Sequence, residues 1–150
     1  MSLDAPAAAG ALSWRGYRRL DFELEGRASL LVLPDRPAPG RPWIWRTQFF
    51  DHEPQADVAL LGLGLHVAFT DMPDLYGGPE AMARMDAFWE LLVHRHGLSA
   101  RAVLEGFSRG GLYAVNWAAR HPDRVAALYL DAPVCDIRSW PAGRGAGPGS

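Results

Sequence analysis

The sequence predicts an α/β fold, in which a mostly parallel, doubly wound sheet carries an antiparallel hairpin at its N-terminal edge. From residue 43 onward, short apolar runs typical of strands alternate with helical patterns, an order typical of parallel sheets covered by helices. Two β-like runs with a turn signal between them precede this alternation. The chain has 150 residues, 49% of them hydrophobic, which is enough to bury one core.

The hairpin is expected within residues 17–33. The run Arg19–Leu24 alternates between polar and apolar residues, and Ser29–Leu33 is apolar after its first residue. Gly26-Arg27 supplies the turn signal between the two runs, and Pro34 ends the second run. A proline-rich loop is expected to follow.

Four further strands and three helices are expected after that loop. The strands are predicted at Trp43–Trp45, Leu65–Thr70, Ala102–Glu105 and Ala126–Leu130. The helices are predicted at Asp57–Leu63, from Pro79 to the stop at Gly97, and at Arg109–Arg120. The middle helix has the clearest pattern, because Pro79 occupies its first position and Met82, Met85 and Phe88 recur on one face.

Composition and charge argue against several classes of protein. A net charge of −2 gives no reason to expect binding to nucleic acid or to an anionic membrane. The lone Cys135 excludes an internal disulfide, and no Cys or His pairs have the spacing of a zinc site. No apolar run is long enough to span a bilayer. We therefore expect a soluble cytoplasmic protein without metal or cofactor, with a loose N-terminus (1–16), one domain (17–140) and a Gly-rich flexible tail (141–150).

One motif carries the chemistry. Gly106-Phe107-Ser108-Arg109-Gly110 matches G-x-S-x-G and lies where a predicted strand gives way to a predicted helix. A nucleophile elbow requires this placement, because a sharp turn there presents the serine hydroxyl above the sheet. Ser108 is the candidate nucleophile, and a serine that only caps the helix is the alternative.

The same turn suggests how an oxyanion would be held. The backbone N–H of Arg109 lies at the start of the helix, where it would point at a developing negative charge. A second donor should come from the loop after the third strand, Arg46–Phe49, and Gln48 is the choice by position.

Asp136, after the last strand, is a candidate for the acid of the triad. The alternative is a carboxylate that only stabilises a turn or caps a helix. The same two interpretations apply to Asp71 and Asp74, which follow an earlier strand.

None of the five histidines is in a position to act as the base. His52, His66, His94 and His96 precede the elbow, and His121 ends the helix that follows it. That helix is about 18 Å long at roughly 1.5 Å per residue, so His121 lies at the wrong end. The chain is therefore expected to lack its catalytic histidine and to turn over little or no substrate alone.

Residues 42–141 resemble a family of bacterial α/β-hydrolases, in its serine esterase or peptidase-like branch. The similarity rests on five segments of sequence: Trp43-Ile44-Trp45-Arg46-Thr47, His52-Glu53-Pro54-Gln55-Ala56-Asp57, Glu105-Gly106-Phe107-Ser108-Arg109-Gly110-Gly111, Asn116-Trp117-Ala118-Ala119-Arg120-His121-Pro122 and Asp131-Ala132-Pro133-Val134-Cys135-Asp136. The resemblance implies about eight strands and a triad in the order Ser, Asp or Glu, His, with Ser108 as nucleophile. By this resemblance the chain covers the N-terminal two-thirds of the fold and stops after about the sixth strand.

Two functions follow from these expectations. The first is a serine hydrolase that transfers the acyl group of a small ester, thioester or amide through an acyl-enzyme. The second is a non-catalytic remnant or interaction module that keeps the elbow. A shortened sheet should also leave its last strand as an exposed edge and the apolar helix faces in water, so we expect self-association through that edge.

Overall fold

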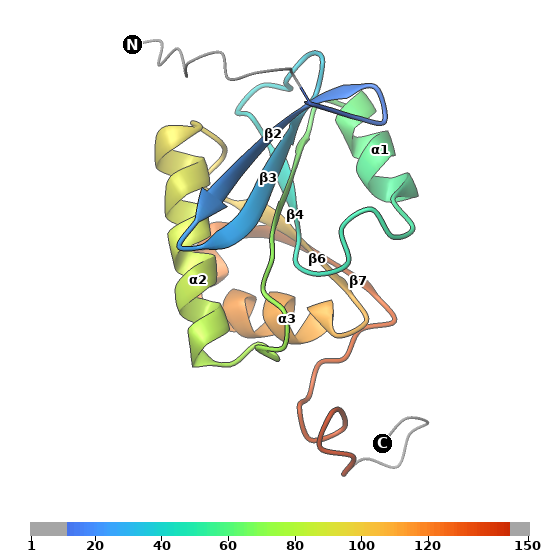
Figure 1. Ribbon diagram of the computed structural model, residues 1–150, viewed down its shortest axis with the longest axis vertical. Coiled ribbons are helices and arrows are strands. Elements are labelled where there is room, and N and C mark those ends of the chain that lie inside the picture. Colours follow the sequence, from blue (N-terminus) through green and yellow to red (C-terminus); the bar gives the residue numbers. More distant parts are fainter. Residues whose placement is uncertain (1–11, 145–150) are drawn as a thin grey trace.

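A computed structural model describes residues 12–144 and shows one seven-stranded sheet with helices on both faces (Figure 1). The strand order is β1-β2-β3-β5-β4-β6-β7. The strands are β1 (Leu12–Trp14), β2 (Tyr17–Leu24), β3 (Arg27–Leu33), β4 (Trp43–Arg46), β5 (His66–Thr70), β6 (Ala102–Phe107) and β7 (Val125–Asp131). The helices are α1 (Gln55–Gly62), α2 (Pro79–Glu90), α3 (Gly110–Arg120), a π-helical turn (Leu91–Arg95) and a 3-10 turn (Pro122–Arg124). The expected α/β class is confirmed.

The predicted hairpin is formed by β2 and β3, which pair antiparallel. Glu25 and Gly26 occupy the tight turn with φ of 50° and 76°, which is the backbone twist that two-residue hairpin turns favour. One strand was not expected: β1 pairs with β2 at the end of the segment predicted to be a loose N-terminus (1–16). Trp14 secures it, because its ring is buried and lies 5.0 Å from the ring of Phe50. Residues 1–11 lie outside the described residues.

The parallel part of the sheet consists of β5, β4, β6 and β7, and β3 joins it antiparallel to β5. Each predicted strand is present, with ends that differ by one or two residues. β6 is interior, with β4 on one side, but β7 on its other side is the outermost strand.

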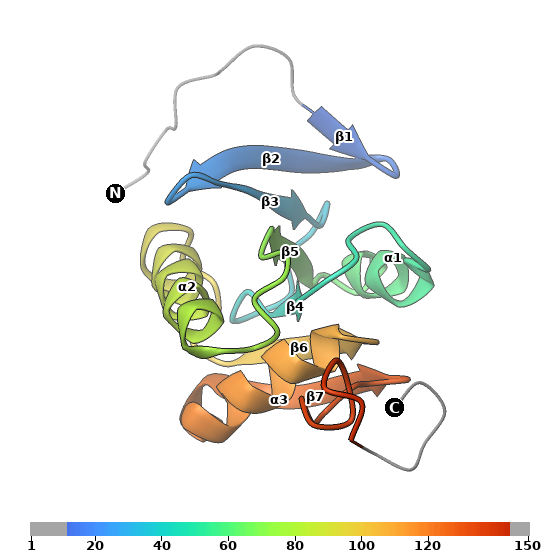
Figure 2. The same ribbon diagram turned by 60° about the horizontal axis from the view of Figure 1, so that its bottom comes forward.

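The helices cover the two faces unequally (Figure 2). α2 and α3 pack together on one face over the larger core cluster, whereas α1 lies on the other face. The expectation that their apolar faces would meet water is wrong, because Phe88 and Trp117 are 0% exposed and Leu112 is 1% exposed. The two helices bury these side chains against each other and the sheet.

Exposed apolar surface is found on β7 instead. Leu128, Tyr129 and Leu130 are 44%, 44% and 37% exposed. The last strand is therefore an exposed edge, as expected, and α3 covers only part of its face.

Of the expected tail, residues 141–144 are exposed and 145–150 lie outside the described residues. Within residues 12–144, no helix has the length and apolar character needed to cross a membrane.

Candidate active site

Ser108 occupies a sharp turn between the end of β6 at Phe107 and the start of α3 at Gly110. Its φ is 52°, a left-handed conformation that costs a non-glycine residue roughly 1–2 kcal/mol. Backbone hydrogen bonds hold it: the Ser108 N–H donates to the Asp131 carbonyl at 3.1 Å, and the Ser108 carbonyl accepts from Val134 at 2.8 Å and from Gly111 at 3.1 Å. The turn is therefore fixed by the end of β7 and the loop that follows it.

Three glycines make this turn sterically feasible. A Cβ atom at Gly106 would lie 3.0 Å from the Gly111 Cα, and one at Gly111 would lie 2.5 Å from the carbonyl oxygen of Val134. A Cβ atom at Gly110 would lie 2.8 Å from the Thr47 Oγ1 atom. Strand, helix and neighbouring loops thus approach to distances that only glycine allows.

The candidate oxyanion loop, residues 47–53, lies against the start of α3. The Thr47 hydroxyl is 2.9 Å from the carbonyl oxygens of both Glu105 and Gly110, which joins this loop to the elbow. The backbone nitrogen of Gln48 would lie 3.6 Å from a Cβ atom at Gly110. Among residues 12–144, neither the N–H of Gln48 nor that of Arg109 donates to a protein acceptor. The structure thus brings the two predicted donors into one neighbourhood and leaves both N–H groups available.

The side chains of these two residues have other contacts. The Gln48 amide is buried and donates to the Met72 carbonyl at 3.1 Å, so only its backbone could serve an oxyanion. The Arg109 guanidinium lies 4.8 Å from the ring centre of Phe49, and its Nη1 atom is 3.9 Å from Asp74. The Arg109 side chain therefore lies beside the candidate oxyanion loop.

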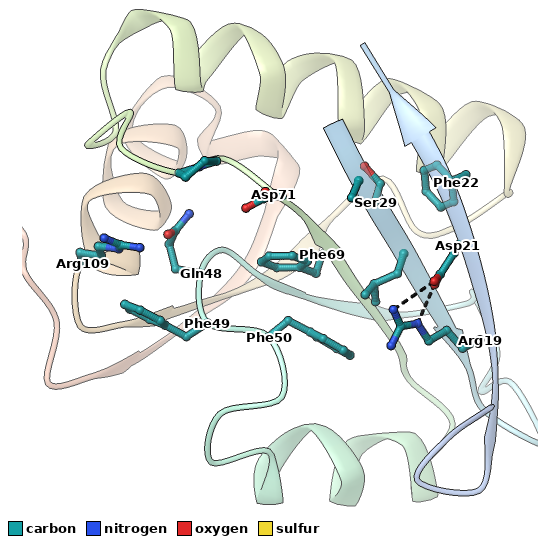
Figure 3. A pocket seen from close by; sticks show the side chains of 13 residues that line it. Arg19, Asp21, Phe22, Ser29, Gln48, Phe49, Phe50, Phe69, Asp71 and Arg109 are labelled. Atoms are coloured by element: carbon teal, nitrogen blue, oxygen red, sulfur yellow. Dashed lines mark hydrogen bonds and ion pairs between the residues drawn. The ribbon is translucent and has the colours of Figure 1, made fainter. Parts of the chain in front are cut away.

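A cavity of about 520 Å³ opens beside this loop (Figure 3). Arg109 and Gln48 line one side of it, and strands β2 and β3 line the other. Its aromatic walls come from four phenylalanines, Phe22, Phe49, Phe50 and Phe69. Besides Gln48 and Arg109, the polar residues that line the cavity are Arg19, Asp21, Ser29 and Asp71. Arg19 Nε and Asp21 Oδ1 form an ion pair at 2.6 Å. The cavity could accept an apolar or aromatic group next to the candidate oxyanion donors.

A buried ionic cluster below the candidate oxyanion loop was missed by sequence reasoning. Arg46, Asp57 and Glu105 are each at most 3% exposed. Arg46 Nη1 lies 2.9 Å from Asp57 Oδ2 and 3.3 Å from Glu105 Oε1. Burial, followed by the neighbouring Asp57, raises the pKa of Glu105 to about 9. The only signal in the sequence is that Arg46 and Glu105 each stand within or beside an apolar strand.

The candidate acid has a local partner. The Asp136 carboxylate accepts hydrogen bonds from Arg138 at 2.7 and 3.0 Å, and these hydrogen bonds lower the pKa of Asp136. It also accepts from the backbone N–H of Arg138, which is the contact expected of a turn carboxylate. A role for Asp136 in a triad stays a prediction.

Within the described part of the chain, no histidine forms a hydrogen bond with the Ser108 hydroxyl, and three histidines have partners elsewhere. His66 is buried in β5, where loss of hydration lowers its pKa. His94 pairs with Glu90, and His96 stacks on Phe22. His121 lies at the far end of α3 against Asp86 at 2.8 Å, as expected.

His52 contacts a residue of the elbow motif. It belongs to the candidate oxyanion loop, is exposed, and its ring stacks on Phe107 at 5.3 Å between centres. Phe107 and Ser108 are consecutive residues, so His52 lies beside the elbow, although no hydrogen bond joins it to the serine among the described residues.

The chain is similar to known esterases. A segment of 68 residues is 44% identical to the pimeloyl-[acyl-carrier protein] methyl ester esterase of Chromobacterium violaceum and covers 44% of this chain and 26% of that protein. The match therefore spans about a quarter of the curated relative. No protein-family model matches the chain.

Two solved structures share the arrangement of strands and helices. The acetyl xylan esterase from Aspergillus awamori superposes with a TM-score of 0.60 at 12% identity, covering 73% of this chain and 50% of that one. A cold-adapted esterase from an Arctic intertidal metagenomic library superposes with a TM-score of 0.56 at 17% identity, covering 79% of this chain and 65% of that one. At these identities the likeness shows a common fold, and a common fold does not determine the reaction that a protein catalyses.

Proposed function

We propose, on the premise that this chain has the α/β-hydrolase fold, that it supplies the nucleophile and the oxyanion site of a serine hydrolase. The observation that carries the proposal is the left-handed Ser108 in a glycine-walled turn between β6 and α3. Such strain persists only where the surrounding structure imposes it, and in this fold it is used to expose a nucleophile.

The reaction would be acyl transfer from a small ester, thioester or amide. The Ser108 oxygen forms a bond to the acyl carbon, the bond from that carbon to the leaving group breaks, and the serine proton passes through a base to the leaving group. Water then hydrolyses the acyl-enzyme in the reverse sense. The N–H groups of Arg109 and Gln48 have no protein acceptor in the described residues, so they are free to hold the oxyanion formed in each step.

The base is the missing element of this proposal. None of the described histidines hydrogen-bonds to Ser108, and a serine hydroxyl is a weak nucleophile without a partner that takes its proton. We therefore propose that the 150 residues alone have little or no turnover and that the histidine comes from outside them. The acid, for which Asp136 remains a candidate, would orient that histidine.

The cavity beside Gln48 and Arg109 is the proposed place for an apolar or aromatic part of the substrate. Phe49, Phe50 and Phe69 offer ring surfaces there, and Arg109 supplies a positive charge at the rim. The relative from Chromobacterium violaceum is described as acting on a methyl ester of an acyl-carrier protein conjugate. We propose that the substrate of this chain is also an ester, whose acyl group need not be the pimeloyl group of that relative.

A non-catalytic role is the second candidate, since the oxyanion donors and the elbow would survive in an interaction module that has lost its triad. The test compares hydrolysis of p-nitrophenyl acetate by the 150-residue chain and by the same chain joined to the segment encoded directly downstream. Each is measured with Ser108 and with Ser108→Ala, and Ser13→Ala, which changes an exposed serine of β1, is the control. Ser108-dependent turnover of about 1 per second or more in the longer protein supports the hydrolase. Its absence from both proteins favours the interaction module.

A further inference from the structure

We propose that Asp57 and Glu105 share one proton beneath the candidate oxyanion loop, and that the resulting neutral cluster with Arg46 fixes the backbone of that loop. The positioning role rests on the proposed function, whereas the shared proton does not. The cluster joins three elements, because Arg46 ends β4, Asp57 belongs to α1 and Glu105 belongs to β6.

The charges in the cluster do not balance if both acids are ionised. The side chains of Arg46 and Asp57 are 1% and 0% exposed, and that of Glu105 is 4% exposed. One guanidinium would then face two carboxylates, which would leave a net negative charge in the core. Burial of an uncompensated charge is strongly unfavourable, and the usual response of a buried acid is to keep its proton.

Two carboxyl oxygens in the cluster are available to that proton. Asp57 Oδ1 and Glu105 Oε2 are buried, and neither has a hydrogen-bond partner among the described residues. The other oxygen of each carboxyl faces Arg46 Nη1. Ionised carboxylates only accept, so two of them cannot hydrogen-bond to each other, whereas one proton makes a donor of one acid. A hydrogen bond between the two side chains is among the causes that raise the pKa of Glu105.

The surroundings of Glu105 favour its protonated form. Loss of hydration raises the pKa of Glu105, and so do the hydrogen bond to Asp57 and the negative charges of Asp57 and Asp131. Arg46 acts in the opposite direction. The charged groups that face Glu105 are thus Arg46 from β4, Asp57 from α1 and Asp131 from β7.

The remaining donors of Arg46 point into the candidate oxyanion loop. Nε donates to the Gln48 carbonyl at 3.3 Å, and Nη2 donates to the His52 carbonyl. Between and after these anchors, Phe49, Asp51 and Glu53 have φ of 55°, 70° and 47°. Left-handed residues need support from outside the loop. Arg46 gives this support, and the two acids keep the guanidinium in place.

The first test measures thermal stability against pH for the wild-type chain, for Glu105→Gln and for Glu23→Gln. Glu23 is an exposed glutamate of β2 and serves as the control. With its raised pKa, folded Glu105 keeps a proton that the unfolded chain releases. Stability therefore falls as pH rises from 4.5, the ordinary value, to about 9. Glutamine mimics the protonated acid and cannot ionise. Glu105→Gln should thus melt above the wild type at about pH 8.5 by a margin that shrinks toward about pH 5.

The second test begins with the wild-type chain, and its decisive result, the presence or absence of one band, does not depend on a variant that folds. Infrared difference spectroscopy at about pH 7 should show the carbonyl stretch of a buried protonated carboxyl group, and this band should be lost in Glu105→Gln or Asp57→Asn but kept in Glu23→Gln. A wild-type spectrum without such a band would overturn the shared proton. Parallel pH profiles of Glu105→Gln and the wild type would do the same.

The positioning role has a separate measurement. Hydrogen exchange of the amides in residues 47–53 should be as slow in Glu105→Gln as in the wild type, and several-fold faster in Glu105→Ala. The amides of β2 and β3 should exchange alike in all three proteins. Equal exchange of the loop in Glu105→Ala would show that the cluster does not hold it. Because none of these readouts involves hydrolysis, they can fail or succeed independently of the proposed function.

Discussion

Ser108 is held in its left-handed conformation by hydrogen bonds from β7 and the following loop, not by its own preference. Replacement by glycine should relieve the strain, and replacement by alanine should retain it. We expect Ser108→Gly to exceed Ser108→Ala in free energy of unfolding by about 1 kcal/mol. Denaturation by urea measures the difference.

The matched control is Ser13, an exposed serine in β1. There the backbone is extended, so glycine should be the less stable of the two replacements because it loses more conformational freedom on folding. If Ser108→Gly were no more stable to unfolding than Ser108→Ala, the turn would have to relax when the serine is removed.

The Ser108 turn illustrates what the sequence can predict about single residues. A G-x-S-x-G string between a strand and a helix pattern is enough to place this turn, because the glycines and the strand ends are all local features. The role of Arg46, Asp57 and Glu105 was not predictable, because these residues are far apart in the sequence. They come together only in the fold, where α1 packs on β5 and where β4 lies between β5 and β6 in the sheet.

The connection between β6 and α3 depends on close approach of whole elements. Gly111 faces the carbonyl oxygen of Val134, and an added Cβ atom would lie 2.5 Å from it, so either α3 or the loop after β7 would have to move. We expect Gly111→Ala to reduce the free energy of unfolding by about 2 kcal/mol. The measurement is a denaturation midpoint at constant slope.

Gly62 in α1 is the corresponding control for this change. A Cβ atom there would meet only the Tyr17 hydroxyl oxygen at 3.8 Å, an ordinary contact, so Gly62→Ala should be neutral or stabilising by up to about 1 kcal/mol. A loss of stability of the same size in both variants would indicate that the close approach at Gly111 is not the cause.

Most elements were predictable because their signals are local, and the exceptions have physical reasons. Leu12–Trp14 is too short to show a pattern, and it becomes a strand only because β2 offers a pairing edge. The end of the long helix widens into a π-helical turn at Leu91–Arg95, which apolar spacing does not distinguish from an α-helix. The burial of α2 and α3 was misjudged, because the sequence does not show that these two helices cover each other.

Of the two outermost strands in the described sheet, β7 carries three consecutive exposed apolar side chains, Leu128, Tyr129 and Leu130, whereas β1 exposes Leu12. We propose that copies of this chain associate through the edge at β7, and that Leu128→Lys shifts the population toward the monomer. Leu63 is 71% exposed but lies in a turn, so Leu63→Lys is the control. Sedimentation velocity at several concentrations measures the change. A monomeric wild type, or an equal effect of both substitutions, would exclude association through β7.

On the proposed function, the chain alone should also be a poor catalyst, because no histidine among residues 12–144 hydrogen-bonds to the Ser108 hydroxyl to act as its base. We expect p-nitrophenyl acetate hydrolysis at the same background rate by the wild type and by Ser108→Ala. The variant His52→Ala tests whether a histidine within the chain acts as the base. If the wild type shows Ser108-dependent turnover and His52→Ala loses it, His52, which stacks on Phe107, is the base.

The most direct measurement of the central claim, that Ser108 is a nucleophile whose base lies outside these 150 residues, is site-resolved labelling with a fluorophosphonate. The chain alone and the chain joined to the segment encoded downstream are treated, digested and mapped by mass spectrometry. The account predicts an adduct on Ser108 in the longer protein, and labelling of the chain alone no greater than in Ser108→Ala. An adduct on another serine, or equal labelling of the longer protein with and without Ser108, would contradict it.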